Sequence, residues 1–558
     1  MSDLIRRMRH RRFQIKPDAE VMFHVELPTG TKLTLPLDNV SLTGLGVWSA
    51  ELPPDEQIHV GTLVPAAKIT FKDHEYTLGR MVLRTTGLRD GRQFFGFSCV
   101  DAKVPVDSPL SKHFLQTLEE PDAPFEFELS PDRFSMASFA ETASSNVDIF
   151  GKVHQFSVFM RDWRKTAKFS YENIREASQG PRIALDRKRR GGRQDYIIMG
   201  SNDYLGLAAH PEVKEAAKKA IDDYGFGSTG SPVTTGITRL HVDLSEKLAK
   251  MFKKDRVVLF NSGYAANVGI ISSLVQAQDL VVADMLAHAS IQDAMQMSKG
   301  AARFFKHNSV AHLRRVMREH RDQYAGCLLV SEGVFSMDGD VAPVDELVKT
   351  AKDHKARLMI DEAHSFGVIG ETGMGAVEKY NAYNDVDVIM GTFSKIGGGI
   401  GGFAAVSEEV ADWLWCWARA HVFSVSIPPS TAAAALKAIE IFERDRERLS
   451  KLRENLAHFK KGLSQLGYHL PATHESAVVP VIVGDEKKLE IMNSVLMEHG
   501  VFVVPIVYPA VSKNNCRFRF TVMATHTQSD LDLVLNILEM AMLKADFKFS
   551  DVDEARAS

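Results

Sequence analysis

Between residues 256 and 392 the sequence repeats one pattern, a short apolar run followed by a longer amphipathic stretch. VVLF precedes SGYAANVGIISSLV, LVVAD precedes AHASIQDAMQM, and CLLVSEG precedes DELVKTAKDH, before ARLMIDEAH and DVDVIMGTFSK. Short apolar runs are typical of buried strands, and amphipathic stretches of this length are typical of helices. Strands that alternate with helices form mostly parallel sheets with helices on both faces. The region therefore predicts an α/β domain built on such a sheet.

The rest of the chain divides where its composition changes. Residues 1–118 contain short alternating strands separated by turns, which predict a small all-β module, and residues 119–160 are rich in Pro, Ser and acidic residues, as expected of a linker. Residues 161–430 contain the α/β pattern. Residues 431–548 mix strands with helices and predict a smaller α+β domain, and residues 549–558 form a tail.

Composition restricts the partners and the compartment. The formal net charge of −4 gives no general reason to expect a nucleic acid polymer or an anionic membrane as the main partner. The four cysteines include no CxxC pair, which argues against a zinc site or a disulfide framework and suits a reducing cytosol. The basic N-terminus is followed by no apolar core, and we find no apolar run long enough to cross a bilayer. We therefore expect a soluble, cytoplasmic protein.

One lysine, Lys395, lies in the glycine-rich segment GTFSKIGGGIGG. Three functions are possible for the central region that contains it. The glycines of this segment fit a dinucleotide-binding fingerprint, but FAAVS, a predicted strand, follows where that fingerprint requires a helix. IDEAH, at residues 360–364, matches the acidic strand end of a helicase-type ATPase, but the chain has no GxxxxGK[ST] phosphate loop. The third function is a Schiff-base lysine that holds pyridoxal phosphate (PLP).

A PLP site needs several groups besides the lysine. The pyridine nitrogen requires a carboxylate, and Asp361 ends a predicted strand, where open α/β sheets place ligand-binding groups. The phosphate requires N–H groups at the start of a helix, which NSGYAAN at residues 261–267 provides, and Ser336, Thr392 and Ser394 can add hydroxyls. Each feature alone is more often structural. Together, at the ends of successive strands, they favour PLP.

Motifs in a fixed order also resemble the α-oxoamine synthase family of fold-type I PLP enzymes. From about residue 165 to 545 they are NDYLGL, GSTGSPVTTGITRLH, FNSGYAAN, EGVFSMDGD, DEAHSFGVIGETGMG, GTFSK and RFRFTVMATHT. The resemblance implies a doubly wound, mostly parallel sheet, a small C-terminal α+β domain and a homodimer. DEAHSFG and DVDVIMGTFSK are most similar to the serine palmitoyltransferase branch.

The resemblance assigns roles to residues that match the family's motifs. Lys395 would hold the cofactor and move the α-proton of the substrate, and Asp361 would pair with the pyridine nitrogen. His364 would hydrogen-bond the ring oxygen, and His288 would stack on the ring. The phosphate would be held by backbone or hydroxyl groups of Gly263, Tyr264, Ser336 and Thr392.

The same resemblance implies how the substrate is bound. Arg519 would grip the amino-acid carboxylate, a task that suits a forked cation, and Asn202 would contact the substrate. Pro232 stands where many family members carry arginine, which puts the choice of thioester in doubt.

The implied reaction is a decarboxylative condensation. A small amino acid (serine, glycine or alanine) would react with an acyl thioester of coenzyme A or acyl carrier protein to give an α-amino ketone and CO2. A lysine whose pKa is lowered by partial burial and nearby positive charge suits the proton transfer. Two alternatives stay open: another PLP enzyme such as an aminotransferase, or a cyclic di-GMP-binding protein whose PLP fold is not catalytic.

The N-terminal module resembles a PilZ domain, a small β-barrel. PilZ domains clamp cyclic di-GMP with an RxxxR arm and a [DN]xSxxG turn. The turn motif is complete in Asn39, Ser41 and Gly44. The arm is either Arg7 with Arg11 or Arg12 with Lys16, and lysine cannot replace the forked donors of arginine. The resemblance implies regulation of the enzyme by cyclic di-GMP, and the alternative is a degenerate barrel that binds no nucleotide.

Overall fold

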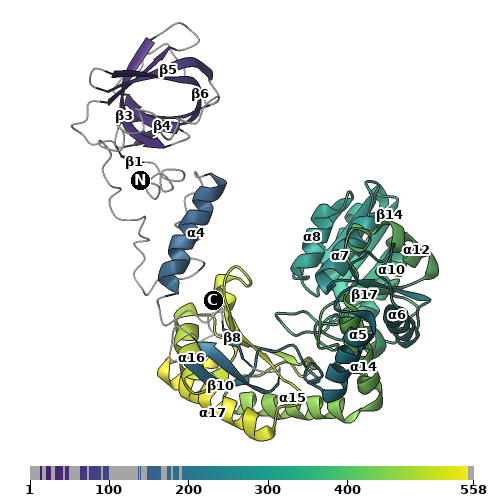
Figure 1. Cartoon of the computed structure of the whole chain (residues 1–558). Helices are drawn as coiled ribbons and strands as arrows, with labels where there is room; N and C mark the ends of the chain where they lie inside the picture. The colour runs from purple at the N-terminus through teal and green to yellow at the C-terminus, as the bar shows by residue number, and fades with distance from the viewer. Residues whose placement is uncertain are drawn as a thin grey trace. The chain divides into compact units, whose positions relative to one another are not determined.

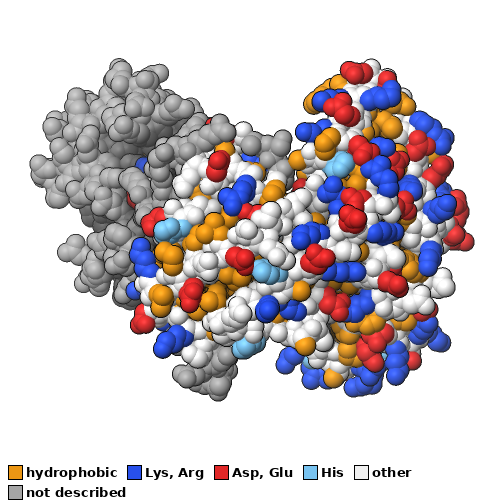
Figure 2. Space-filling view, turned by 90° about the horizontal axis from the view of Figure 1, so that it is seen from below, with side chains coloured by type: hydrophobic (Ala, Val, Ile, Leu, Met, Phe, Trp, Pro, Cys, Tyr) orange, Lys and Arg blue, Asp and Glu red, His pale blue; other side chains and the backbone are white. Residues whose placement is uncertain are grey.

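The computed structural model divides the chain into two compact units, Met1–Thr166 and Ala167–Ser558 (Figure 1). It describes strands between residues 13 and 99, residues 136, 139, 148–164, 173–176 and 180–187, and the continuous range 192–550. Over these residues no helix is both long and apolar enough to cross a membrane. Figure 2 shows that Lys and Arg side chains are interspersed with Asp and Glu on the face drawn, as expected for a small net charge.

The described strands of the first unit form one antiparallel sheet. They are β1 (Phe13–Gln14), β2 (Val21–Glu26), β3 (Lys32–Ser41), β4 (Gly44–Ser49), β5 (Leu63–Phe71), β6 (His74–Arg89) and β7 (Arg92–Cys99). Their order is β1-β3-β2-β5-β6-β7-β4, and β3 also pairs with β4, so the sheet closes on itself. Phe23, Val64 and Met81 are fully buried.

The predicted cyclic di-GMP residues are only partly within this described region. Asn39 and Ser41 lie in β3, and Ser41 pairs with Gly44 at the start of β4. The predicted arm residues lie outside the described residues: Arg7, Arg11 and Arg12. The PilZ resemblance stays a prediction.

The first unit also contains a helix, α4 (Ile149–Trp163), in the range expected to be a linker. Asp148 caps its start, where Oδ1 accepts a hydrogen bond of 2.6 Å from the Gly151 N–H. Its buried side chains recur at helical spacing: Gln155, Val158, Phe159 and Trp163. This apolar stripe distinguishes α4 from the Pro- and Ser-rich residues before it.

The second unit is built on a seven-stranded sheet with the order β11-β17-β16-β15-β14-β12-β13. Its strands are β11 (Arg256–Phe260), β12 (Asp279–Asp284), β13 (Ala301–Phe305), β14 (Gly326–Glu332), β15 (Arg357–Asp361), β16 (Val388–Thr392) and β17 (Gly402–Val406). Strands β12 to β16 pair in parallel, and β17 is antiparallel to both of its neighbours. The predicted mostly parallel sheet is confirmed, and FAAVS lies mainly in β17.

Helices cover both faces of this sheet. They are α5 (Pro211–Tyr224), α6 (Arg239–Met251), α7 (Gly263–Leu274), α8 (Ala289–Met297), α9 (Val310–His320), α10 (Val344–Asp353), α11 (Ala376–Lys379), α12 (Glu408–Trp417), α13 (Arg419–Val422) and α14 (Pro429–Arg444). Alternate residues of β12 belong to opposite core clusters, Leu280 and Val282 to one and Val281 and Ala283 to the other. The strands are apolar throughout because both faces are buried.

Two smaller sheets complete the unit, with the orders β19-β10-β9-β8 and β18-β21-β20. Their elements are β8 (Ile174–Arg175), β9 (Arg182–Arg187), β10 (Gly192–Ile198), α15 (Glu447–Gln465), β18 (Val478–Ile482), α16 (Glu486–Glu498), β19 (Val501–Phe502), β20 (Val504–Ile506), β21 (Arg517–Thr521) and α17 (Gln528–Lys544). Ile197 pairs with Val501, so β10 lies with the C-terminal elements, as Figure 1 shows. Residues 182–198 thus share a sheet with the C-terminal segment, although the predicted boundaries place them in the domain 161–430.

Candidate active site

The carboxyl ends of neighbouring strands meet at one edge of the large sheet. Glu332, Asp361 and Thr392 end β14, β15 and β16, and Lys395 follows in the turn after β16. A cavity of about 200 Å³ opens there. Its lining comprises Ser262, Gly263, Tyr264, Asn267, His288, Ser290, Glu332, Asp361, Ala363, His364, Met390, Thr392, Ser394 and Lys395. The cavity brings together the predicted catalytic residues and every predicted cofactor residue except Ser336.

The glycines around Lys395 allow its turn to pack against the backbone of other segments. Gly398 has φ 60°, and a Cβ there would lie 2.6 Å from the Cα of Ala208. A Cβ on Gly402 would lie 2.6 Å from the carbonyl oxygen of Ser262, just before α7. The small residues therefore set the lysine turn directly against the start of α7.

The amine of Lys395 makes no hydrogen bond or ion pair with the residues that the structure describes. Burial lowers its pKa, while the carboxylates of Asp361 and Glu332 act in the opposite direction. Glu332 is itself buried, and burial, reinforced by the charge of Asp361, raises its pKa well above the usual value. The raised pKa favours the neutral form of Glu332, which weakens its effect on the lysine.

Asp361 is held in place by two donors. Its Oδ2 accepts a hydrogen bond of 2.8 Å from the side-chain amide of Asn267, and its Oδ1 accepts one of 2.9 Å from the Ala363 N–H. Asn267 also donates to Ser290 Oγ at 2.9 Å. Its own Oδ1 is buried and has no hydrogen-bond partner among the described residues. The arrangement fixes the carboxylate and leaves an acceptor oxygen of Asn267 unused.

His364 is buried and His288 is exposed at the surface, and both have defined hydrogen-bond partners. His364 Nδ1 lies 2.7 Å from the Tyr204 hydroxyl. Burial, reinforced by the positive charge of Lys395, lowers the pKa of His364 well below its usual value. His288 caps α8, where its Nδ1 accepts from the Ser290 N–H at 3.2 Å. Burial lowers the pKa of His288 too, so both rings are neutral at neutral pH.

The start of α7 is suited to an anion. Ser262 caps the helix by accepting from the Ala265 N–H at 3.0 Å. The N–H groups of Gly263 and Tyr264, in the first turn, donate to no other group in the described part of the chain. A Cβ on Gly263 would lie 3.1 Å from the Cβ of Thr392, so glycine leaves room between these donors and the threonine hydroxyl. Free N–H groups and a hydroxyl form a typical phosphate site.

The remaining predicted residues contact one another beside this cavity. Arg519, on β21, donates from Nε to the Ser336 carbonyl oxygen at 2.6 Å and from Nη1 to Asn202 Oδ1 at 3.2 Å. Ser336 is thus held through its backbone. The structure brings Arg519, Asn202 and Ser336 together, but none of them lines the cavity that contains Lys395.

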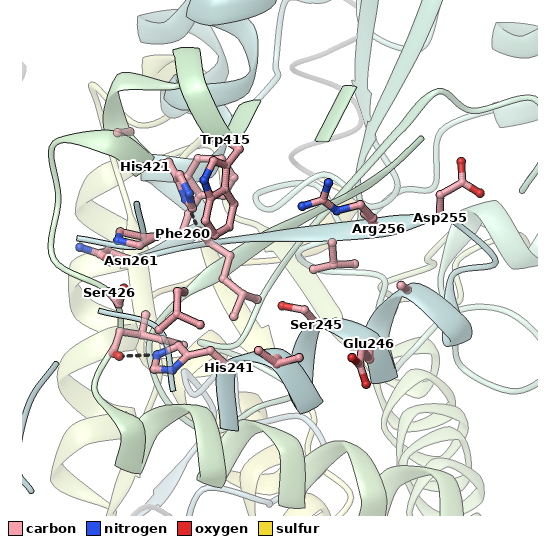
Figure 3. Close-up of a pocket in the computed structure, with 18 residues that line it drawn as sticks. His241, Ser245, Glu246, Asp255, Arg256, Phe260, Asn261, Trp415, His421 and Ser426 are labelled. Carbon is pink, nitrogen blue, oxygen red and sulfur yellow. Dashed lines mark hydrogen bonds between the residues drawn. The ribbon is translucent and has the colours of Figure 1, made fainter. Parts of the chain in front are cut away.

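A larger cavity of about 360 Å³ lies beside the edge strand β11, between α6 and the α12–α13 segment (Figure 3). His241, whose Nε2 donates to the Ile427 carbonyl oxygen at 2.8 Å, and Trp415 line it, as does Pro232. It contains none of the predicted catalytic or cofactor residues. Convergent polar groups, and not cavity size, therefore locate the candidate site.

Comparison with known proteins shows to which protein family the chain belongs. Residues 194–538 match the family model for aminotransferase class I and II. An 8-amino-7-oxononanoate synthase from Thermoanaerobacter pseudethanolicus is 37% identical over 380 residues, which are 68% of this chain and 94% of that protein. The solved structure of a Sphingomonas wittichii serine palmitoyltransferase matches with a TM-score of 0.68 and 30% identity, over 72% of this chain and 99% of that one.

The chain belongs to the aminotransferase class I and II family. Its relatives are α-oxoamine synthases, which are one group of enzymes within this family. The protein is a PLP-dependent enzyme of this kind, an acyltransferase. The site fits the cofactor: a lysine amine, a buried carboxylate, N–H groups at a helix start and the Oδ1 of Asn267 surround one cavity. Within the described part of the chain the amine, these N–H groups and this Oδ1 have no hydrogen-bond partner.

Some residues of this site were not assigned from the sequence. They are Asn267, Ser290, Tyr204 and Glu332. Asn267 and Tyr204 lie inside the quoted motifs NSGYAAN and NDYLGL, and Glu332 opens EGVFSMDGD. These three residues thus lie within motifs that the sequence shows, but the residues that they contact are distant in the chain.

Proposed function

We propose that the second unit condenses a small amino acid (serine, glycine or alanine) with an acyl thioester of coenzyme A or acyl carrier protein, with loss of CO2. The product would be an α-amino ketone. The observation that carries the proposal is the amine of Lys395, which has no partner in the described ranges and shares one cavity with Asp361, His288 and His364. The relatives support it: serine palmitoyltransferase, by its name, combines serine with a palmitoyl group.

The cofactor would be held by groups on three sides of the cavity. Lys395 would bind it covalently, and Asp361, fixed by Asn267, would keep the ring nitrogen protonated. The phosphate would be bound by the Gly263 and Tyr264 N–H groups with the Thr392 hydroxyl, and Ser336, which lies beside the cavity, would add its hydroxyl. When bound, PLP supplies a ring that accepts negative charge from the α-carbon of the substrate.

The charges of the site suit proton transfer at that carbon. Burial lowers the pKa of Lys395, which increases the share of its amine that is unprotonated and able to take the α-proton. His288 and His364 are neutral, so they would contact the ring without adding positive charge. Arg519 and Asn202, already in contact, would bind the amino-acid carboxylate.

The test is to supply the PLP-loaded protein with acyl-coenzyme A and serine, glycine or alanine in turn. Equal release of thiol and CO2 with one amino acid supports the proposal, and Lys395→Ala should abolish both. Exchange of the amino group with a keto acid, without CO2, would replace the proposal with an aminotransferase. No reaction with any amino acid would overturn it.

We further propose that the first unit is a PilZ-like domain that binds cyclic di-GMP and regulates the enzyme. A closed sheet that carries Asn39 and Ser41 at the end of β3 and Gly44 at the start of β4 supports this. Isothermal titration of the full chain with cyclic di-GMP tests it, with Ser41→Ala and Arg11→Ala expected to weaken binding. Absence of heat would favour a degenerate barrel. By resemblance to the family the enzyme would be cytoplasmic and would act as a homodimer. Sedimentation of the full chain tests the homodimer.

A further inference from the structure

His307, between β13 and α9, connects two loops that carry residues of the site. Its Nδ1 lies 3.0 Å from Asp284 Oδ1, and its Nε2 lies 2.9 Å from Asp340 Oδ2. Two carboxylates facing both ring nitrogens require that both nitrogens donate, so the ring is an imidazolium. Burial acts to lower the pKa of His307, but the hydrogen bonds to Asp284 and Asp340 outweigh it and raise the pKa to about 10. The ring therefore stays charged over the physiological range.

The first of these loops runs from Asp284 to His288. Asp284 ends β12 and is fully buried. Its Oδ1 also accepts from the Leu286 N–H at 2.8 Å, and its Oδ2 accepts from the Asn308 N–H at 2.8 Å. The Ala287 N–H donates to the Asp284 carbonyl oxygen at 3.1 Å. The segment before His288 is thus a tight turn around one carboxylate, and this turn leads directly into His288 at the start of α8.

The second loop runs from β14 to α10 and carries Ser336. The Phe335 N–H donates to the Asp340 carbonyl oxygen at 3.1 Å, and the Gly339 N–H donates to the Phe335 carbonyl oxygen at 2.8 Å. The Phe335 ring packs edge-on against His307, with centroids 4.5 Å apart. Asp340 therefore closes the turn whose Ser336 carbonyl oxygen is bonded to Arg519.

We propose that the His307 imidazolium is a positioning residue that holds the turn of His288 and the loop of Ser336 in one relative position. The inference rests on the proposed function only for the roles of His288, Ser336 and Arg519. Without the cation, buried Asp284 would lose its charged partner and would face Asp340 as a like charge. A neutral amide cannot replace the ring, because its donors lie on a single nitrogen and cannot reach carboxylates on opposite sides.

The test compares His307→Gln with a matched control, His320→Gln, at the end of the neighbouring helix α9. In the protein without cofactor, amide hydrogen exchange should become about tenfold faster both in residues 284–288 and in residues 334–341. Exchange in β15 should not change. The dissociation constant for PLP should rise about tenfold, and kcat should fall while KM for the acyl thioester stays within about twofold. The control should match the wild type.

A milder variant covers the case in which His307→Gln does not fold. Asp340→Asn keeps the shape of the loop but removes one carboxylate, and it should give the same pattern with smaller changes. Wild-type exchange in both segments, or faster exchange in only one of them, would overturn the inference. If the enzyme fails to release CO2 but exchange still rises in both segments, the proposed function fails and the link between the loops stands.

Discussion

Replacing Asn267 with alanine should weaken binding of the cofactor more than it weakens the fold. Asn267 is 1% exposed and donates to Asp361 Oδ2 at 2.8 Å and to Ser290 Oγ at 2.9 Å. Alanine removes both hydrogen bonds. Asp361 then keeps only the Ala363 N–H as a hydrogen-bond donor among the described residues, so its carboxylate is held less firmly in place. The ring nitrogen of PLP would pair with that carboxylate, so a less firmly held carboxylate should bind the cofactor more weakly.

The size of the effect follows from the charge on the acceptor. A hydrogen bond to a charged group contributes about 1.5–3 kcal/mol, whereas one between neutral groups contributes about 1 kcal/mol. If the whole contribution of the bond to Asp361 is lost from the free energy of cofactor binding, the dissociation constant for PLP should rise about 10- to 100-fold. The lost bond to Ser290 should appear instead as about 1 kcal/mol in the unfolding of the protein without cofactor.

The assay titrates protein without cofactor with PLP and follows the visible absorbance of the bound cofactor. Ser290→Ala is the matched control, because it removes the other partner of Asn267 and leaves the bond to Asp361 intact. Its dissociation constant should stay within about threefold of wild type. Wild-type affinity in Asn267→Ala, or weaker binding in Ser290→Ala than in Asn267→Ala, would refute the reasoning.

Three further outcomes are expected. Lys395→Ala should abolish CO2 release and leave the circular dichroism and melting temperature of the cofactor-free protein near wild type, because its amine has no partner among the described residues. Gly375→Ala should destabilise the protein by about 2–4 kcal/mol in urea unfolding, since φ is 107° and a Cβ would meet the Glu362 carboxylate. His307 contributes stability that is complete below about pH 6.5 and is lost as pH rises toward its folded pKa of about 10. Between these limits the unfolding free energy should fall by at most about 1.4 kcal/mol per pH unit, and by less in His307→Gln.

Much of the large domain could be predicted from local patterns. Runs such as LVVAD and ARLMIDEAH predict strands buried on both faces, and residues of β12 do alternate between two core clusters. Since parallel strands end at one edge, Asp361 and Thr392 could be placed near Lys395 from the sequence. FAAVS after the glycines similarly predicts a strand, which is β17.

The partners of these residues could not be predicted in the same way. Tyr204 lies 160 positions from His364, and His307 lies 23 and 33 positions from the carboxylates that it joins. Such contacts depend on how loops from different strands fold over the edge of the sheet. No periodicity in the sequence reports that arrangement, because periodicity describes only which face of an element is buried.

The sequence alone determined the α/β class, the alternation of strands and helices in the large domain, the strand end that bears Asp361 and the turn that bears Lys395, because these depend on residue spacing within one element. Only the tertiary structure decided that β10 pairs with β19, that Asn267 holds Asp361, and that Ser336 meets Arg519 beside the cavity. Those contacts join segments that are distant in the chain, and their geometry is set by packing of the whole core. For that reason most residues of the site could be predicted from the sequence, whereas the hydrogen bonds that position them could not.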